Sequence, residues 1–122
     1  WGMNLYIDTS TNTFIRLDLR SGDIVLLSKA IPANHAQAEK LLPLLEQMLL
    51  KQGLKLADLE KVVVADQGEG FTSLRIGIIT ANALAYALGI GVETDTGRFR
   101  SAKGIAIVEP SYSRPPSITR KA

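Results

Sequence analysis

The stretch from Thr72 to Leu88 constrains the fold of this chain most, because it has helical spacing and almost no polar face. Large apolar side chains recur along it, and alanine and glycine fill most positions between them. A helix that is apolar all round is buried on two sides, and small residues let another backbone come close. We therefore expect one side to lie on a sheet, and the other to face a second helix and a second protein.

Three segments before this helix predict the start of the sheet. Residues 3–8, 13–20 and 24–31 alternate or run apolar, and polar turns separate them. The turn Ser21-Gly22-Asp23 joins the last two segments, which predicts a hairpin. The domain is therefore expected to open with three consecutive antiparallel strands.

A helix over residues 35–52 is predicted next, with Asn34 as N-cap and Gln37 completing a capping box. Residues 61–65 are short and β-branched, as in a central parallel strand. This strand, a glycine-rich turn and the helix over residues 72–88 form a crossover unit. The fold class predicted is α/β, with a mixed sheet of about five strands: three antiparallel strands, then helix, strand and helix.

Composition excludes several kinds of site. The chain has no cysteine and one histidine, His35, so it offers neither a disulfide framework nor a His-His metal pair, and no metal is expected. No apolar run approaches the ~18–20 residues of a membrane span, and no secretory signal is evident. We expect a cytoplasmic domain without membrane contact, in which Trp1 and Gly2 are additions before a natural start at Met3.

Charge is distributed unevenly. Residues 1–97 hold 8 Lys/Arg and 11 Asp/Glu, a net charge of −3, whereas residues 98–122 hold six Lys/Arg against Glu109 alone, a net charge of +5. Such a basic segment is either an arm that contacts a polyanion or a solvated terminus, and the solvated terminus is favoured. Within it, residues 104–108 are a candidate strand before an extended tail.

One candidate set for nucleotide binding is Asp8, Thr9, Ser10 and Arg75. A first strand that ends in Asp-Thr-Ser and continues into a hairpin has the order used by actin-like and sugar-kinase-like ATPases. The same tripeptide also makes a good turn after a strand, and that interpretation is favoured. Arg75, in an otherwise apolar helix, either pairs with a carboxylate or reaches a cleft, and pairing is favoured.

Five blocks of residues carry a resemblance to a known family. They are Ile7-Asp8-Thr9-Ser10-Thr11, His35 with Leu41-Leu42-Pro43-Leu44-Leu45, Gly53-Leu54-Lys55-Leu56-Ala57-Asp58-Leu59, Phe71-Thr72-Ser73-Leu74-Arg75-Ile76-Gly77 and Ala83-Leu84-Ala85-Tyr86-Ala87-Leu88-Gly89-Ile90. The chain resembles the TsaB family, also called YeaZ. The resemblance implies one actin-like (ribonuclease H-like) domain over residues 3–97, followed by the basic segment 98–122.

The sequence departs from the family pattern in two places. Gln67-Gly68-Glu69-Gly70 stands where the family has Gly-Pro-Gly-Ser. The family's second domain is largely missing, yet residues 109–114 resemble its C-terminal tail, so we expect a natural internal contraction.

The resemblance also implies a function. TsaB is a non-catalytic partner of TsaD and has no cofactor. TsaD transfers a threonylcarbamoyl group to a tRNA adenosine beside the anticodon. The ATPase TsaE joins the complex. Contact with tRNA would be indirect, with Arg114, Arg120 and Lys121 as candidate RNA-contacting residues. The docking residues expected for TsaD, or for a homodimer in isolation, are Ala38, Leu41, Leu42, Leu45, Met48, Leu49, Leu74, Ile78, Ala81, Ala85 and Leu88.

Three alternatives remain open at this stage. A stand-alone homodimer could have kept the helical interface without a TsaD partner. An actin-like ATPase or kinase remnant could retain nucleotide binding, although one domain offers half of a cleft. A peptidase is disfavoured, because the sequence shows no nucleophile–base pair.

Overall fold

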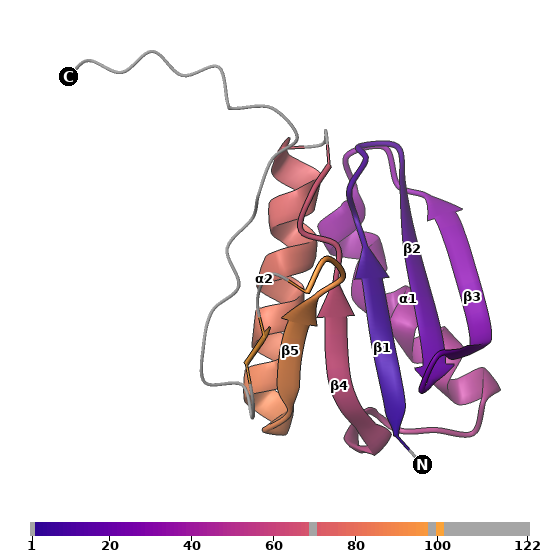
Figure 1. Ribbon diagram of the computed structural model, residues 1–122. Helices are drawn as coiled ribbons and strands as arrows, with labels where there is room; N and C mark the ends of the chain where they lie inside the picture. Colours follow the sequence, from indigo (N-terminus) through magenta and orange to yellow (C-terminus); the bar gives the residue numbers. More distant parts are fainter. Residues whose placement is uncertain (1, 69–70, 98–99, 102–122) are drawn as a thin grey trace.

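The computed structural model describes residues 2–68, 71–97 and 100–101. Within these ranges one sheet and two α-helices account for most of the chain (Figure 1). In chain order the elements are β1 (Met3–Asp8), β2 (Phe14–Ser21), β3 (Ile24–Pro32), α1 (Gln37–Lys51), the 3₁₀ turn η1 (Leu56–Asp58), β4 (Leu59–Val64), α2 (Phe71–Leu88), β5 (Gly91–Thr94) and β6 (Arg100–Ser101).

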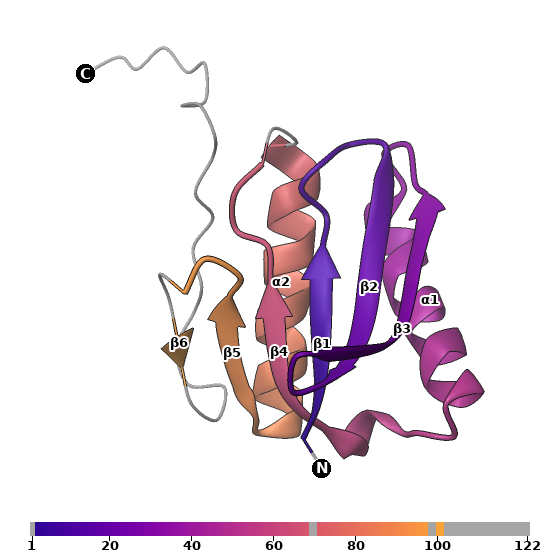
Figure 2. The same ribbon diagram turned by 45° about the vertical axis from the view of Figure 1, so that its right-hand side comes forward.

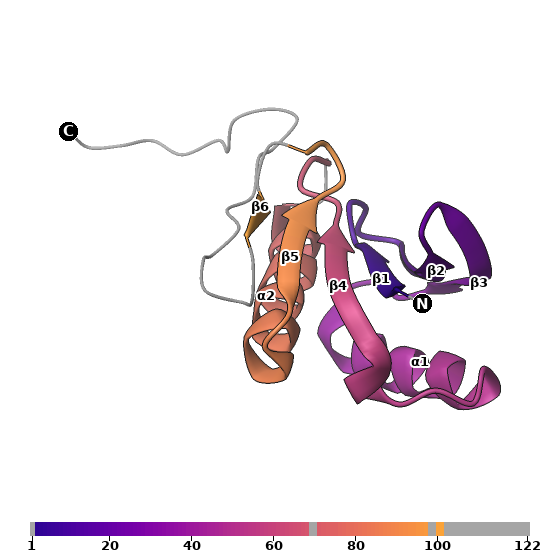
Figure 3. The same cartoon turned by 60° about the horizontal axis from the view of Figure 1, so that its bottom comes forward.

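The sheet has the strand order β3-β2-β1-β4-β5-β6. β1, β2 and β3 pair antiparallel, β4 pairs parallel with β1 and with β5, and the two-residue β6 pairs antiparallel with β5. Both helices lie on the same face of the sheet, as the view along the strands shows (Figure 3). The expected mixed sheet with three opening antiparallel strands and a helix-strand-helix unit is confirmed.

Strict alternation in β2 explains why the two faces of the sheet differ. Ile15, Leu17 and Leu19 are fully buried beneath the helices, and the residues between them face the other side. Residues of one strand alternate between the two faces, so this pattern places the core on one side only. The opposite face, covered by no described helix, carries polar and charged side chains.

The start of α1 differs from the prediction. Asn34 and His35 both have positive φ, so they precede the helix, and Ala36 is the N-cap, without a side-chain capping bond. Gln37 is the first helical residue and is buried; its Nε2 donates to the backbone oxygen of Asn12 at 2.9 Å. The predicted capping box is therefore wrong, because the amide that was to close the box instead ties α1 to the β1–β2 loop.

β5 had no clear sequence signal, because it has only four residues and a single large apolar side chain, Val92, in the core. The predicted strand over residues 104–108 lies outside the described residues. No described helix is long and apolar enough to cross a membrane.

Candidate functional site

The inner faces of the two helices hold most of the residues that the sequence suggested for docking. Each of these residues is at most 3% exposed and belongs to the hydrophobic core of this same domain. They are Leu41, Leu45, Met48, Leu49, Leu74, Ile78, Ala81 and Ala85. These side chains pack into the chain's own core, so they offer little exposed surface to a partner.

The outer faces of the helices carry a different apolar set. Leu42 and Leu50 on α1 are 48% and 80% exposed, and Ile79 and Tyr86 on α2 are 59% and 78% exposed. Of the remaining predicted docking residues, Ala38 is exposed, and Leu88 is partly buried against the core. These four exposed apolar side chains of the two helices, Leu42, Leu50, Ile79 and Tyr86, are here called the outer helix face.

The Asp8-Thr9-Ser10 segment forms a turn that its own side chains close. Asp8 Oδ1 accepts hydrogen bonds from the backbone N–H of Ser10 at 2.9 Å and from Ser10 Oγ at 2.6 Å. This is the arrangement in which an Asp side chain mimics a backbone turn. Arg75, the fourth member of the candidate nucleotide set, lies on the exposed side of α2.

Thr9 lies directly against α2, because Gly77 has no side chain between them. Thr9 is fully buried, and its Oγ1 has no hydrogen-bond partner among the described residues. A Cβ atom at Gly77 would collide with that oxygen, so the helix backbone rests directly on the turn. Gly68 approaches Ser10 in the same way. Two glycines that lie far from this turn in the sequence thus fix its position.

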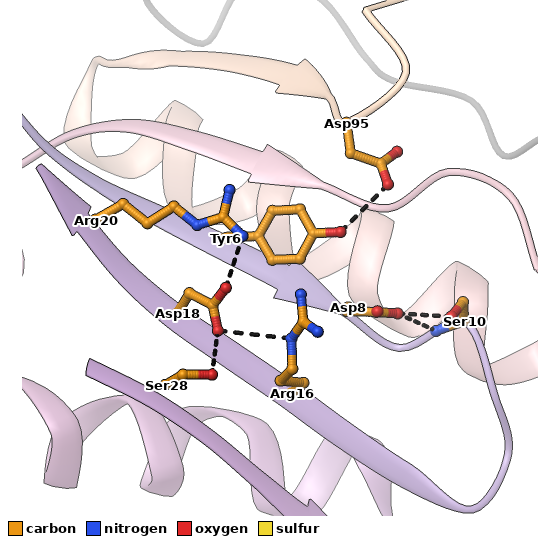
Figure 4. A network of polar contacts seen from close by, with 8 residues as sticks. All are labelled: Tyr6, Asp8, Ser10, Arg16, Asp18, Arg20, Ser28 and Asp95. Atoms are coloured by element: carbon orange, nitrogen blue, oxygen red, sulfur yellow. Dashed lines mark hydrogen bonds and ion pairs between the residues drawn. The ribbon is translucent and has the colours of Figure 1, made fainter. Parts of the chain in front are cut away.

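A polar network covers the sheet face opposite the helices (Figure 4). Asp18, which is 3% exposed, accepts from Arg20 Nη2 at 2.7 Å and from Ser28 Oγ at 2.6 Å, and Arg16 Nε lies 3.5 Å from it. The Arg20 guanidinium lies 4.4 Å from the ring centroid of Tyr6, within range of a cation–π contact. This network stabilises an uncovered sheet face without exposing a large apolar surface.

Burial raises the pKa of Tyr6 to about 12 from 10.0, and the negative charge of Asp95, which accepts the phenol O–H at 3.2 Å, adds to the shift. The neutral phenol is thus favoured in the fold. The contribution of the neutral phenol to the free energy of unfolding is fully present below pH 10 and is lost as the pH rises from 10 to about 12.

Alkaline unfolding tests this contribution. Wild-type protein is expected to lose about 2–3 kcal/mol more of its free energy of unfolding than Tyr6→Phe between pH 9 and pH 12, because phenylalanine does not ionise. Urea unfolding at several pH values measures the difference. Parallel curves for the two proteins would contradict the assignment.

His35 is exposed in the loop before α1. Among the described residues there is no group of three or more His, Asp or Glu able to hold a metal ion. The tail residues Arg114, Arg120 and Lys121 lie outside the described part of the chain.

Comparison with known proteins places this geometry in a family. Residues 31–93, slightly more than half of the chain, match the family model described as TsaD, tRNA N6-adenosine threonylcarbamoyltransferase. A solved structure described as YeaZ from Pseudomonas aeruginosa superposes with a TM-score of 0.67 at 29% identity, covering 76% of this chain and 44% of that chain. This chain belongs to the TsaB/YeaZ family.

Other proteins are similar to this chain over a similar share of their length. A crystal structure of an uncharacterised protein with similarity to peptidase YeaZ, from Pseudomonas aeruginosa, superposes with a TM-score of 0.69 at 28% identity, covering 77% of this chain and 43% of that chain. Uncharacterised proteins of Mycobacterium bovis and Mycobacterium tuberculosis are 38% identical over 89 residues, which is 72% of this chain and 42% of theirs. The chain thus spans less than half the length of these relatives.

Proposed function

We propose that this TsaB/YeaZ domain is a non-catalytic docking subunit. Its partner would be a TsaD-type transferase that makes threonylcarbamoyladenosine in the tRNA anticodon loop. A TsaE-type ATPase and the tRNA would meet this chain only through that complex. Family membership and the exposed outer helix face support the proposal.

The outer helix face has the chemistry of an interface. Burying one large apolar side chain stabilises a complex by about 1.5–3 kcal/mol, and the face offers four such side chains. Tyrosine is enriched among the residues that dominate binding energy, and Tyr86 is the most exposed aromatic side chain among the described residues. Exposure of these groups on two neighbouring helices is the single observation that carries the docking proposal.

Capture of the cognate TsaD tests the proposal. The double variant Ile79→Asp with Tyr86→Asp is expected to weaken TsaD binding at least about 100-fold, because two carboxylates would have to be desolvated in the interface. Isothermal titration calorimetry with purified TsaD measures the affinity. Reconstituted tRNA modification should fall in parallel.

A matched control separates docking from general surface effects. Ile24 is also apolar and 67% exposed, but it lies at the start of β3, away from the outer helix face. Ile24→Asp should bind TsaD as the wild type does. Absence of TsaD binding by well-folded wild-type protein would contradict the proposal and leave a homodimer as the alternative. Equal loss with both variants would contradict the placement of the interface.

A further inference from the structure

β3 forms an open edge of the sheet, at the opposite end of the strand order from β5 and β6. It pairs with β2 on one side and with no described strand on the other (Figure 2). Seven of its nine residues are exposed, and the other two are half-buried. Such an edge presents unpaired backbone groups to which another extended chain can bind.

The hydrogen bonds at the end of β3 show which backbone groups face outward. The Ala33 N–H donates to the backbone oxygen of Thr13 at 2.9 Å, in register with the β2–β3 ladder. Because the hydrogen-bonding direction alternates along an antiparallel strand, every second residue before Ala33 also faces β2. The backbone groups of Ser28, Ala30 and Pro32 therefore point away from the sheet. Proline at this edge costs no ladder bond, since its missing N–H would have faced outward.

A groove of about 210 Å³ runs beside this edge, between β3 and α1. Lys29 and Ile31 line it from the strand, and Lys40, Pro43 and Leu44 are among the residues that line it from the helix. Side chains alternate across a strand, so a strand added to β3 would place every second side chain in this groove. The groove thus offers side-chain contacts next to the open backbone.

The charges around the groove favour an acidic ligand. Lys29 is exposed at the middle of the edge, and Lys40 Nζ lies 3.2 Å from the Pro32 oxygen, while Glu39 is the one carboxylate of the lining. A carboxylate on the added strand would pair with Lys29, and an apolar side chain two positions away would lie near Ile31.

The same lysine disfavours a second copy of this chain. In the antiparallel register that is centred on Lys29, Ser28 of one copy lies opposite Ala30 of the other, and the outward groups of both residues are satisfied in both copies. The two Lys29 side chains then stand directly opposite each other, and like charges in that position are destabilising.

We propose that the β3 edge and its groove bind an extended acidic segment of a partner protein as an added strand. The backbone of Ser28 and Ala30 holds the segment, Lys29 pairs with its carboxylate, and the groove takes its apolar side chain. The groove shares α1 with the outer helix face, but none of its lining residues belongs to that face.

Fluorescence anisotropy with a labelled peptide tests the proposal on the full chain. The probe is Thr-Glu-Thr-Val-Thr-Glu-Thr, and the control peptide has lysine in place of both glutamates. The glutamate peptide should bind at least about tenfold more tightly than the lysine peptide, and less tightly as salt increases. Lys29→Glu should reverse the preference, whereas Lys51→Glu, at the far end of α1, should leave it unchanged.

Ala30→Pro tests the backbone contribution, because it removes an outward N–H without removing a bond to β2. Binding of the glutamate peptide should fall at least about tenfold; if this variant does not fold, the reversal by Lys29→Glu decides alone. Equal binding of the two peptides, or no saturable binding, would overturn the proposal. Self-association in sedimentation that Ala30→Pro abolishes would also overturn it, in favour of a second copy.

Discussion

Leu45→Glu is expected to unfold the domain, whereas Leu42→Glu, three residues away on the same helix, leaves it folded. Leu45 is 1% exposed and lies in the core beneath α1, whereas Leu42 is 48% exposed. A carboxylate at position 45 would be buried without a partner, so the free energy of unfolding should fall by at least about 4 kcal/mol. That is a large part of the whole stability of a small domain.

Circular dichroism and urea unfolding measure both variants. Leu42→Glu should stay within about 0.5 kcal/mol of wild type, the range usual for surface substitutions. Leu42→Glu should weaken partner binding while Leu45→Glu removes the fold itself. A folded, monodisperse Leu45→Glu protein would contradict the placement of this side chain in the core.

Gly77→Ala is expected to destabilise the domain, although alanine is the better helix former. Helix propensity favours alanine over glycine by about 1 kcal/mol. The added Cβ would collide with Thr9 Oγ1, however, and overpacking of a tight contact costs about 1–3 kcal/mol. The steric cost outweighs the gain in propensity, because the residue that the new Cβ would meet, Thr9, is fully buried.

A double-mutant cycle isolates this contact. Thr9→Ala removes the clashing oxygen, which has no hydrogen-bond partner among the described residues. The pair Thr9→Ala with Gly77→Ala should therefore be more stable than the sum of the single variants by about 1 kcal/mol or more. Strict additivity of the unfolding free energies would contradict the contact.

Local patterns were sufficient to predict most of the fold. Alternation in β2 and the apolar run of β4 reflect which faces are buried, and that information lies within each segment. β5 escaped prediction because its burial depends on β4 and α2, which flank it only after folding. The start of α1 was misplaced for a similar reason, since Gln37 bonds to a loop 25 residues away.

The docking surface shows where periodicity stops being informative. Both α1 and α2 have apolar residues on two sides, and the pattern alone does not say which side meets the sheet. Most of the predicted docking residues, among them Leu45 and Ile78, lie in the core. Tyr86 could have indicated the exposed side of α2. A tyrosine has a polar tip and is often left at a surface, whereas alanines are typical of close helix contacts in the core.

The strand order also decides when each part of the sheet can form during synthesis. β1, β2 and β3 are consecutive and pair through short loops, so they can form a meander as soon as the ribosome has released them. β1 is then an edge, and it stays one until α1 and β4 have followed, because its parallel partner begins only at Leu59. For that interval Leu5 and Ile7, which the complete fold buries, lie on a strand with one unpaired edge, and exposed apolar surface beside an unpaired edge makes a folding intermediate prone to aggregation.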